Sequence, residues 1–300
     1  MAKKVNREET RNQVRLEQQK FVDENKHNLS VSSLVKIVGI SRASYYKFKQ
    51  KKFNINFLFN ELLKKYILEC HNNYKGIYGR LRIKRWLEKK YGIVINHKRV
   101  YRLMKELNIK SVIRKKRLKR KYKSPEIVRT NKINREFTAK NLNEKWSIDV
   151  SYIPISNRKF KYLFAIKDLF NGEIVDYSIE NSQTLSQVNR TLERALKGKE
   201  VKNLTIHSDQ GFQFTHKSYI LMLEKQGVKV SHSRRGNCID NSPIESFFGH
   251  LKSEFKYLYS PNTDIEIVEA IKKYIKFYNE ERIQLKLKGY SPKEYRTIAL

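Results

Sequence analysis

The sequence has only two cysteines, Cys70 and Cys238, in 300 residues. Two cysteines so far apart exclude a disulfide-stapled scaffold and a zinc site built from four cysteines. No apolar run approaches the roughly 20 residues that span a bilayer, and the N-terminus lacks the apolar core of a signal peptide. We therefore expect an intracellular protein with no membrane partner.

Acidic residues are also scarce relative to basic ones. The chain has 30 Asp and Glu against 64 Lys and Arg, which gives a formal net charge of +34. Such an excess repels itself in a compact fold, and its natural partner is a polyanion, foremost nucleic acid. Hydrophobic residues make up 39% of the chain, which disfavours intrinsic disorder, and the length suffices for two or three domains.

The charge is concentrated in the first half of the chain. Residues 1–140 hold 39 basic and 11 acidic side chains, whereas residues 141–300 hold 25 and 19. The densest stretch is Lys110–Lys123, where nine of fourteen residues are cationic. Self-repulsion keeps such a segment open, so we interpret residues 110–136 as a basic linker that lies along DNA. A solvated surface run, or a targeting signal, is the alternative.

Residues 1–50 carry a helix-turn-helix pattern. Apolar residues from Val31 to Val38 follow a helical stripe, Gly39 supplies a permissive turn, and Ser41 can cap a second helix. That second helix carries Arg42, Tyr45, Tyr46 and Lys47, and Arg42 is a candidate DNA contact. Plain helical packing is the competing interpretation.

Residues 51–109 carry a second such pattern. A helix over 79–90 is followed by a break at Tyr91-Gly92 and a helix capped by Asn96. Val100, Leu103, Met104 and Leu107 form its buried stripe. Lys98, Arg99 and Arg102, with Lys105, are then left to face a DNA groove.

Residues 137–300 change to a strand-like period and predict an α/β domain. Alternating segments predict antiparallel strands over 146–155, 161–170 and 173–179, the last two joined at Asn171-Gly172. These strands are followed in order by a helix over 185–196, a strand over 204–207, a helix over 216–226 and a strand over 228–231. Two long helices come last, one from about 243 and one over 264–282. This order predicts a ribonuclease-H-like mixed sheet with flanking helices.

Three carboxylates are the candidate catalytic and metal-binding residues. Asp149 lies inside the first strand, Asp209 follows the fourth, and Glu245 lies in the first turn of a helix. If the first and fourth strands are neighbours, these side chains meet and repel one another unless a divalent cation neutralises them. We expect Mg²⁺ or Mn²⁺, with two ions about 4 Å apart serving displacement at a phosphodiester. A solvated surface carboxylate is the ordinary alternative for each.

The helix that carries Glu245 has a distinct polar face. Glu245, Gly249, Lys252 and Lys256 line it, beside an apolar stripe of Phe247, Phe248, Leu251, Phe255 and Leu258. The glycine leaves room for a DNA strand, and the two lysines are candidate phosphate contacts. Of the other residues near these motifs, His207 is favoured as a structural residue over a substrate contact. For His232, Arg234 and Arg235, DNA contact and simple solvation are equally open, and Cys238 is favoured as a partly buried small residue.

These segments together resemble a known family, the OrfB-type transposases of bacterial insertion sequences, in the IS-three/IS-one-fifty group. The segments that carry the resemblance are Ile148-Asp-Val-Ser-Tyr152, His207-Ser-Asp-Gln-Gly211, Asp240-Asn-Ser-Pro-Ile-Glu-Ser-Phe-Phe-Gly-His-Leu-Lys252, Tyr278-Asn-Glu-Glu-Arg282 and Gly289-Tyr-Ser-Pro292, and the Tyr78-Gly79 segment also fits. The resemblance implies a retroviral-integrase-like core with Asp149, Asp209 and Glu245 as metal ligands, and Lys252 near the DNA end.

The family also implies an activity and partners. It implies strand cleavage at the terminal repeats of an element, followed by transfer of a 3′-hydroxyl to target DNA, by a homo-oligomer assembled on the DNA. In such elements an upstream frame, OrfA, supplies a helix-turn-helix and a leucine zipper. No sustained heptad repeat is evident here, so this chain is expected to be the downstream part, with OrfA as partner or fusion. The zinc module of retroviral integrases, which needs two cysteines close together, has no counterpart.

Two other functions stay open on the sequence alone. One is a catalytically silent DNA-binding regulator of the element, and the other is a hydrolytic nuclease with the same core, in which water replaces the 3′-hydroxyl. In each case we expect a bacterial cytoplasmic protein associated with the nucleoid.

Overall fold

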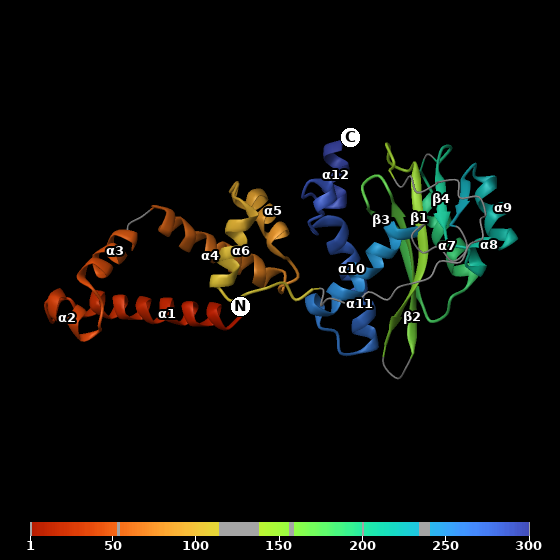
Figure 1. Ribbon diagram of the computed structural model, residues 1–300. Coiled ribbons are helices and arrows are strands. Elements are labelled where there is room, and N and C mark those ends of the chain that lie inside the picture. The colour runs from red at the N-terminus through yellow and green to blue at the C-terminus, as the bar shows by residue number, and fades with distance from the viewer. Residues whose placement is uncertain are drawn as a thin grey trace. The chain divides into compact units, whose positions relative to one another are not determined.

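The computed structural model of the protein describes residues 2–52, 55–113, 138–155, 159–199, 201–233 and 241–299 (Figure 1). The chain forms two compact units, Met1–Leu68 and Glu69–Leu300. Most of the predicted basic linker over 110–136 lies outside the described residues, as do Arg234, Arg235 and Cys238. The four-part division of the chain at 50, 109 and 136 stays a prediction.

The first unit is helical, with α1 (Ala2–Asn25), α2 (Val31–Ile37), α3 (Arg42–Lys52) and the part of α4 (Ile55–Asn73) up to Leu68. Ser30 caps α2 by accepting the backbone N–H of Ser33, and Gly39 has the positive φ of 72° that the turn requires. The Ser41 hydroxyl accepts the N–H of Ser44 at 3.1 Å, as a cap of α3 should. The predicted helix-turn-helix geometry is therefore present over these residues.

A small core holds α1, α2 and α3 together. Its buried members are Val22, Leu34, Val35 and Tyr45. The Tyr45 hydroxyl donates to Asp23 of α1 at 3.2 Å, so this tyrosine is a core residue and not part of a surface with Arg42, Tyr46 and Lys47, which are exposed. The sequence analysis does not predict α1 as a separate long helix.

The second unit begins with the end of α4, followed by α5 (Arg80–Tyr91) and α6 (His97–Glu106). Gly92 ends α5 in the left-handed conformation, with φ of 66°, and the Asn96 side chain accepts the N–H of Lys98 to cap α6. Val100, Leu103 and Met104 are buried, which confirms most of the predicted stripe. The two helices pack against each other.

The rest of this unit is built on a five-stranded sheet in the order β3-β2-β1-β4-β5. Its first three strands are β1 (Lys145–Pro154), β2 (Phe160–Asp168) and β3 (Ile174–Glu180), and β2 is antiparallel to both β1 and β3. The two short strands β4 (Thr205–Ser208) and β5 (Lys229–His232) run parallel to β1. This is the mixed sheet that the sequence predicts.

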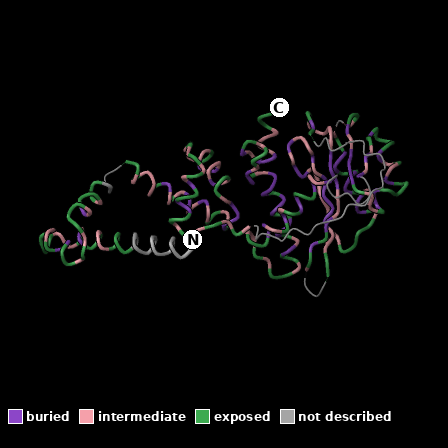
Figure 2. The backbone as a smooth tube through the Cα atoms, viewed as in Figure 1, coloured by how far each residue is buried: buried purple, intermediate pink, exposed green. Residues whose placement is uncertain are grey.

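Helices cover both faces of the sheet. The helix α7 (Leu185–Leu196) lies between β3 and β4 in the chain, and α8 (Phe212–Thr215) and α9 (Lys217–Lys225) lie between β4 and β5. Trp146 and Ile148 of β1 pack in one core with α7 and α9, which are in contact with β3, β2 and β5. The long helix α10 (Ser242–Tyr259) contacts β1 and β2, and α11 (Asp264–Glu280) contacts β3. Buried residues follow the strands and the helices packed on them (Figure 2).

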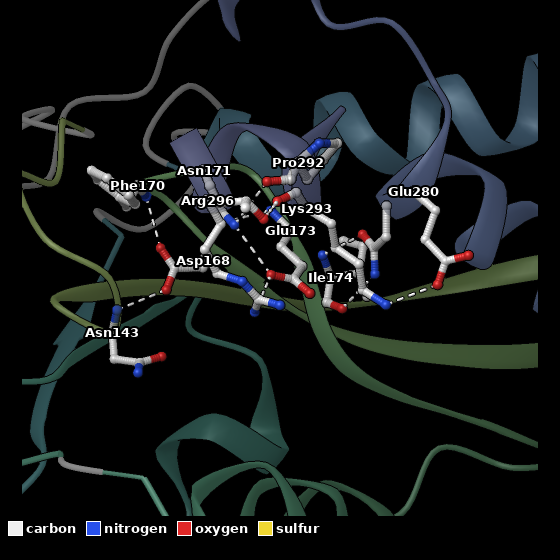
Figure 3. Close-up of polar contacts among 12 residues, drawn as sticks. Asn143, Asp168, Phe170, Asn171, Glu173, Ile174, Glu280, Pro292, Lys293 and Arg296 are labelled. Carbon is white, nitrogen blue, oxygen red and sulfur yellow. Dashed lines mark hydrogen bonds and ion pairs between the residues drawn. The ribbon is translucent and has the colours of Figure 1, made fainter. Parts of the chain in front are cut away.

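The chain then passes through a short 3₁₀ helix, Leu285–Leu287, into α12 (Pro292–Ala299), which is tied to the β2–β3 turn (Figure 3). Asn171 donates to the carbonyl of Pro292 at 3.2 Å, and Arg296 donates to Glu173 at 2.9 Å. Gly172 has a φ of 74°, as expected of the predicted Asn-Gly turn. No helix in the described parts of the chain is long and apolar enough to cross a membrane.

Asn279 of α11 fixes the start of β3. Its side chain accepts the N–H of Ile174 and donates to the carbonyl of Ile174, both at 2.9 Å, and it is buried. Asn279→Ala leaves both backbone groups buried without these partners, so we expect a loss of about 2–4 kcal/mol in unfolding free energy. Urea denaturation measures this. Arg190→Ala, which removes an exposed ion pair with Glu180, is the control and should cost about 1 kcal/mol or less; equal losses would contradict the role of Asn279.

Candidate active site

The strand register brings Asp149 and Asp209 to the same place. Ser147 of β1 lies opposite His207 of β4, and the two strands are parallel. Two residues further along each strand come Asp149, in the middle of β1, and Asp209, directly after the end of β4. Since side chains alternate along a strand, Asp149 shares the face of Ser147, opposite the core residues Trp146 and Ile148.

Hydrogen bonds attach the start of α10 to β1 beside Asp149. Asn241, which is buried, accepts the hydroxyl of Ser147 at 2.6 Å and donates to the carbonyl of Ile148 at 3.0 Å. The ammonium of Lys167 donates to the carbonyl of Pro243, in the first turn of α10, at 2.9 Å. These contacts place Glu245, two residues further, on the side of the sheet where Asp149 lies.

The two faces of α10 are as the sequence predicts. Ile244, Phe247, Phe248, Leu251 and Phe255 are buried. The exposed face holds Glu245, Gly249, Lys252 and Lys256. Only Leu258 of the predicted apolar stripe is half-buried.

The three carboxylates act on one another electrostatically. Burial raises the pKa of Asp149 to about 7, with further contributions from Asp209 and Glu245, against the Val150 N–H and Lys252, which lower it. The pKa of Glu245 is also raised, by desolvation and by Asp209. A nearby negative charge and partial desolvation both disfavour the ionised form of a carboxyl group, and so both raise its pKa. The residues therefore form one electrostatic group.

The chemistry of this donor set fits a hard divalent cation, because all three groups offer carboxylate oxygens and a cation would relieve their repulsion. Among the described residues, however, no three His, Cys, Asp or Glu side chains are arranged closely enough to hold a metal ion. The predicted ligand role of Asp149, Asp209 and Glu245 thus stays a prediction.

A pocket of about 560 Å³ adjoins the first two carboxylates. Its lining consists of Asp149, Val150, Gln183, Thr184, Leu185, Asp209, Gly211, Phe212 and Gln213. Asp209 accepts the N–H of Gly211 at 2.9 Å, and a Cβ on Gly211 would stand 2.9 Å from the Gln213 amide nitrogen and 3.0 Å from Asp209 Oδ1. A side chain at this position would therefore have to displace the Gln213 amide or the Asp209 carboxylate.

Lys252 lies near Asp149 from the exposed face of α10. Its ammonium stands 4.7 Å from the ring centroid of Tyr152 on β1. Burial lowers the pKa of Lys252, and the charge of Asp149 opposes this effect. Lys256, one turn further, is exposed. In the helical segments Arg42, Lys98 and Arg102 are exposed and Arg99 is half-buried, and Arg102 lies 3.7 Å from Glu106.

Two residues near the carboxylates have structural roles, one expected from the sequence and one not. His207 is buried, and its ring nitrogens lie 3.0 and 3.1 Å from the hydroxyls of Ser231 and Ser233, so it supports the β4–β5 edge. Asn241 is the residue that attaches the start of α10 to β1. Its place next to the helix start was visible in the sequence, but its partners on β1 were not.

Family models match most of the chain from residue 59 onward. An integrase core domain matches residues 139–238, a second integrase core model matches residues 245–300, and an HTH-like domain matches residues 59–117. InsK of Escherichia coli K12, described as a transposase for insertion sequence element IS150, is 41% identical over 237 residues, covering 78% of this chain and 82% of that protein. The chain belongs to the family of insertion-element transposases.

A second relative agrees with this assignment. A transposase-like protein of Haemophilus influenzae is 40% identical over 208 residues, which cover 69% of this chain and 96% of that protein. Among solved structures, the HTLV-2 integrase catalytic core domain in complex with magnesium aligns with a TM-score of 0.41 and 19% identity, over 51% of this chain and 95% of that one. The observed topology and the family models confirm the predicted fold class and the predicted function class, transposition and DNA integration.

The raised pKa of Asp149 makes the stability of this transposase depend on pH. A carboxyl whose pKa is higher in the folded than in the unfolded state stabilises the fold most below about pH 4, and this contribution is lost as the pH rises through about 7. In EDTA, the wild type should thus lose on the order of 3 kcal/mol more than Asp149→Asn between pH 4 and 8. Urea denaturation at several pH values measures this, and parallel pH profiles for the two proteins would contradict it.

Proposed function

We propose that Asp149, Asp209 and Glu245 are the catalytic carboxylates of a divalent-metal-dependent DNA strand transferase. The supporting observation is that acidic side chains from β1, the end of β4 and the first turn of α10 come close enough for the charges of Asp209 and Glu245 to raise the pKa of Asp149. Bringing like charges together costs free energy, and the binding of a cation is the usual compensation at functional sites.

Each residue has a part in the proposed reaction. Mg²⁺ or Mn²⁺, two ions in the full site, would polarise the attacking and leaving oxygens. Asp149 and Asp209 would hold them from the sheet, and Glu245 would hold them from α10. Lys252, with Lys256 beyond it, would bind phosphates of the element end and keep the scissile bond next to the carboxylates.

The proposed reaction has two displacements at phosphorus. In the first, the oxygen of water attacks at the element end, the bond to the 3′ oxygen breaks, and a 3′-hydroxyl is released. In the second, that hydroxyl loses its proton to solvent and attacks a target phosphodiester, which forms a new bond and frees a target 3′-hydroxyl. A hydrolytic nuclease would perform only the first step, so the nature of the products separates the two.

Partners and location follow from the same proposal. The substrates are the terminal repeats of the element and the target DNA, which places the protein in the bacterial cytoplasm with the nucleoid. Two ends must be joined to one target, so we propose that several copies act together. An OrfA product is the proposed helper, and strand transfer with and without it tests that part.

The carboxylates are tested by substitutions that keep shape and remove charge. Asp149→Asn, Asp209→Asn and Glu245→Gln should each lower cleavage of labelled element ends in Mg²⁺ below about one-hundredth of wild type, because each removes a proposed metal ligand. DNA affinity should change little. Glu224→Gln, an exposed carboxylate on α9, is the control. Wild-type cleavage by any of the three variants would remove that residue from the proposed site.

The α6 surface is tested by salt dependence. If Lys98 and Arg102 contact phosphates, the double variant Lys98→Ala/Arg102→Ala should reduce the slope of log affinity against log salt by about two on B-DNA. Fluorescence anisotropy with duplex element ends measures this. The matched pair Lys272→Ala/Lys276→Ala removes two cations from α11 and should leave the slope unchanged. The same slope change in both pairs would argue for a general charge effect and against binding by α6.

A further inference from the structure

Two segments that the proposed chemistry does not use meet in the folded chain. Tyr78 follows α4, and Arg282 and Ile283 follow α11. The N–H of Ile283 donates to the Tyr78 hydroxyl at 3.2 Å, and Tyr78 is fully buried. Near the same junction, a Cβ on Gly289 would stand 3.2 Å from the side chain of Arg85 on α5.

The centre of this junction is a buried carboxylate, Glu254 of α10. Arg282 donates two hydrogen bonds to this carboxylate, of 2.7 Å from Nε and 2.6 Å from an Nη atom. The side chains of Arg282 and Glu254 are both fully buried. Tyr274 of α11 donates to it at 2.9 Å. Arg82 of α5 approaches to 3.7 Å, so the carboxylate joins three helices and the segment after α11.

Glu254 is ionised in spite of its burial. Desolvation raises the pKa of Glu254, but the hydrogen bonds and charge of Arg282, together with Arg82 and His250, outweigh this effect and bring it below its ordinary value. Two guanidinium groups then face one carboxylate. Both guanidinium groups also lie against aromatic rings, which stabilise positive charge. Arg82 is 5.6 Å from the ring centroid of Tyr78, and Arg282 is 5.5 Å from that of Tyr278.

This network connects the HTH-like helices to the catalytic helix. Arg82 is on α5, which packs against α6, whereas Glu254 is nine residues after Glu245 on the same helix. We propose that Arg82 and Glu254 are positioning residues that hold α6 at a fixed distance from the catalytic carboxylates. The position of the cut is then set by where α6 binds on the element end. The proposal rests on the proposed function, in which α6 binds DNA and Glu245 takes part in cleavage.

A purely stabilising role predicts something different. In that case, loss of Arg82 lowers activity and thermal stability together but leaves the cut at the same phosphodiester. Arg82→Gln suits the test because it removes one charge and leaves the Glu254–Arg282 pair in place. Lys89→Gln is the matched control, since Lys89 of the same helix makes an exposed ion pair with Glu294 of α12 across the same junction.

The first measurement maps cleavage positions on end-labelled element DNA. For Arg82→Gln we expect the fraction of cuts at the wild-type phosphodiester to fall at least threefold, in favour of neighbouring positions, with total DNA affinity within twofold of wild type. Lys89→Gln should cut as the wild type does. An unchanged cleavage position in Arg82→Gln, at whatever rate, would overturn the positioning role.

The second measurement does not need activity. Spin labels at Val94→Cys, before α6, and Leu221→Cys, on α9, report the distance between the HTH-like helices and the sheet; both sites are exposed, and Cys70 is buried. In a Cys238→Ser background, we expect a narrow distance distribution that broadens at least twofold with Arg82→Gln and not with Lys89→Gln. A distribution that stays narrow in Arg82→Gln would overturn the proposal.

A milder variant covers the case in which Arg82→Gln does not fold. Tyr78→Phe removes only the hydroxyl that accepts the N–H of Ile283, and it should broaden the same distribution and scatter the cuts to a smaller extent. Wild-type-like behaviour of Tyr78→Phe would then count against the junction. If the wild type itself cuts no element end, the proposed function fails, and the distance measurement alone decides whether the junction is rigid.

Discussion

The attachment of α10 to β1 is the contact on which the arrangement of the candidate site depends. Asp149 and Asp209 are placed by strand pairing, which any mixed sheet of this order would provide. Glu245 comes from a helix on the face of the sheet, and a helix can slide or turn. Asn241 removes that freedom, because its amide bonds to both Ser147 and Ile148 in the strand that carries the first carboxylate. Lys167 adds a second point of attachment at Pro243.

The same helix holds two glutamates in opposite electrostatic surroundings. Glu245 lies among carboxylates and its pKa is raised, whereas Glu254 lies among guanidinium groups and its pKa is lowered. Nine residues of helix separate them by about 13 Å. One end of α10 thus has an excess of negative charge that suits a cation, and the other end has its charge satisfied within the protein. The first arrangement is typical of a functional site, and the second of a structural one.

Local signals in the sequence predicted the elements well. Caps such as Ser41 and Asn96 and the Asn171-Gly172 turn act over a few residues, so their geometry follows from the chain itself. The adjacency of the first and fourth strands entered the sequence argument only as a condition, and the pairing of β1 with β4 meets it. Tyr45 shows the limit of such local signals: the motif places it on the second helix but does not indicate its partner Asp23 on α1, with which it lies in the core. Partners from another part of the chain decided the outcome.

Contacts between distant segments account for what the sequence could not predict. Lys167 and Pro243 are 76 residues apart, and Tyr78 and Ile283 are 205 apart. No periodicity or spacing links such pairs, because each residue alone reads as an ordinary lysine or tyrosine. The motif around Arg282 was recognisable only as part of a family pattern, without a physical reason for an arginine there. The structure supplies that reason: the buried carboxylate of Glu254 on α10 needs a partner that stays charged and binds with two donors, and arginine meets both requirements.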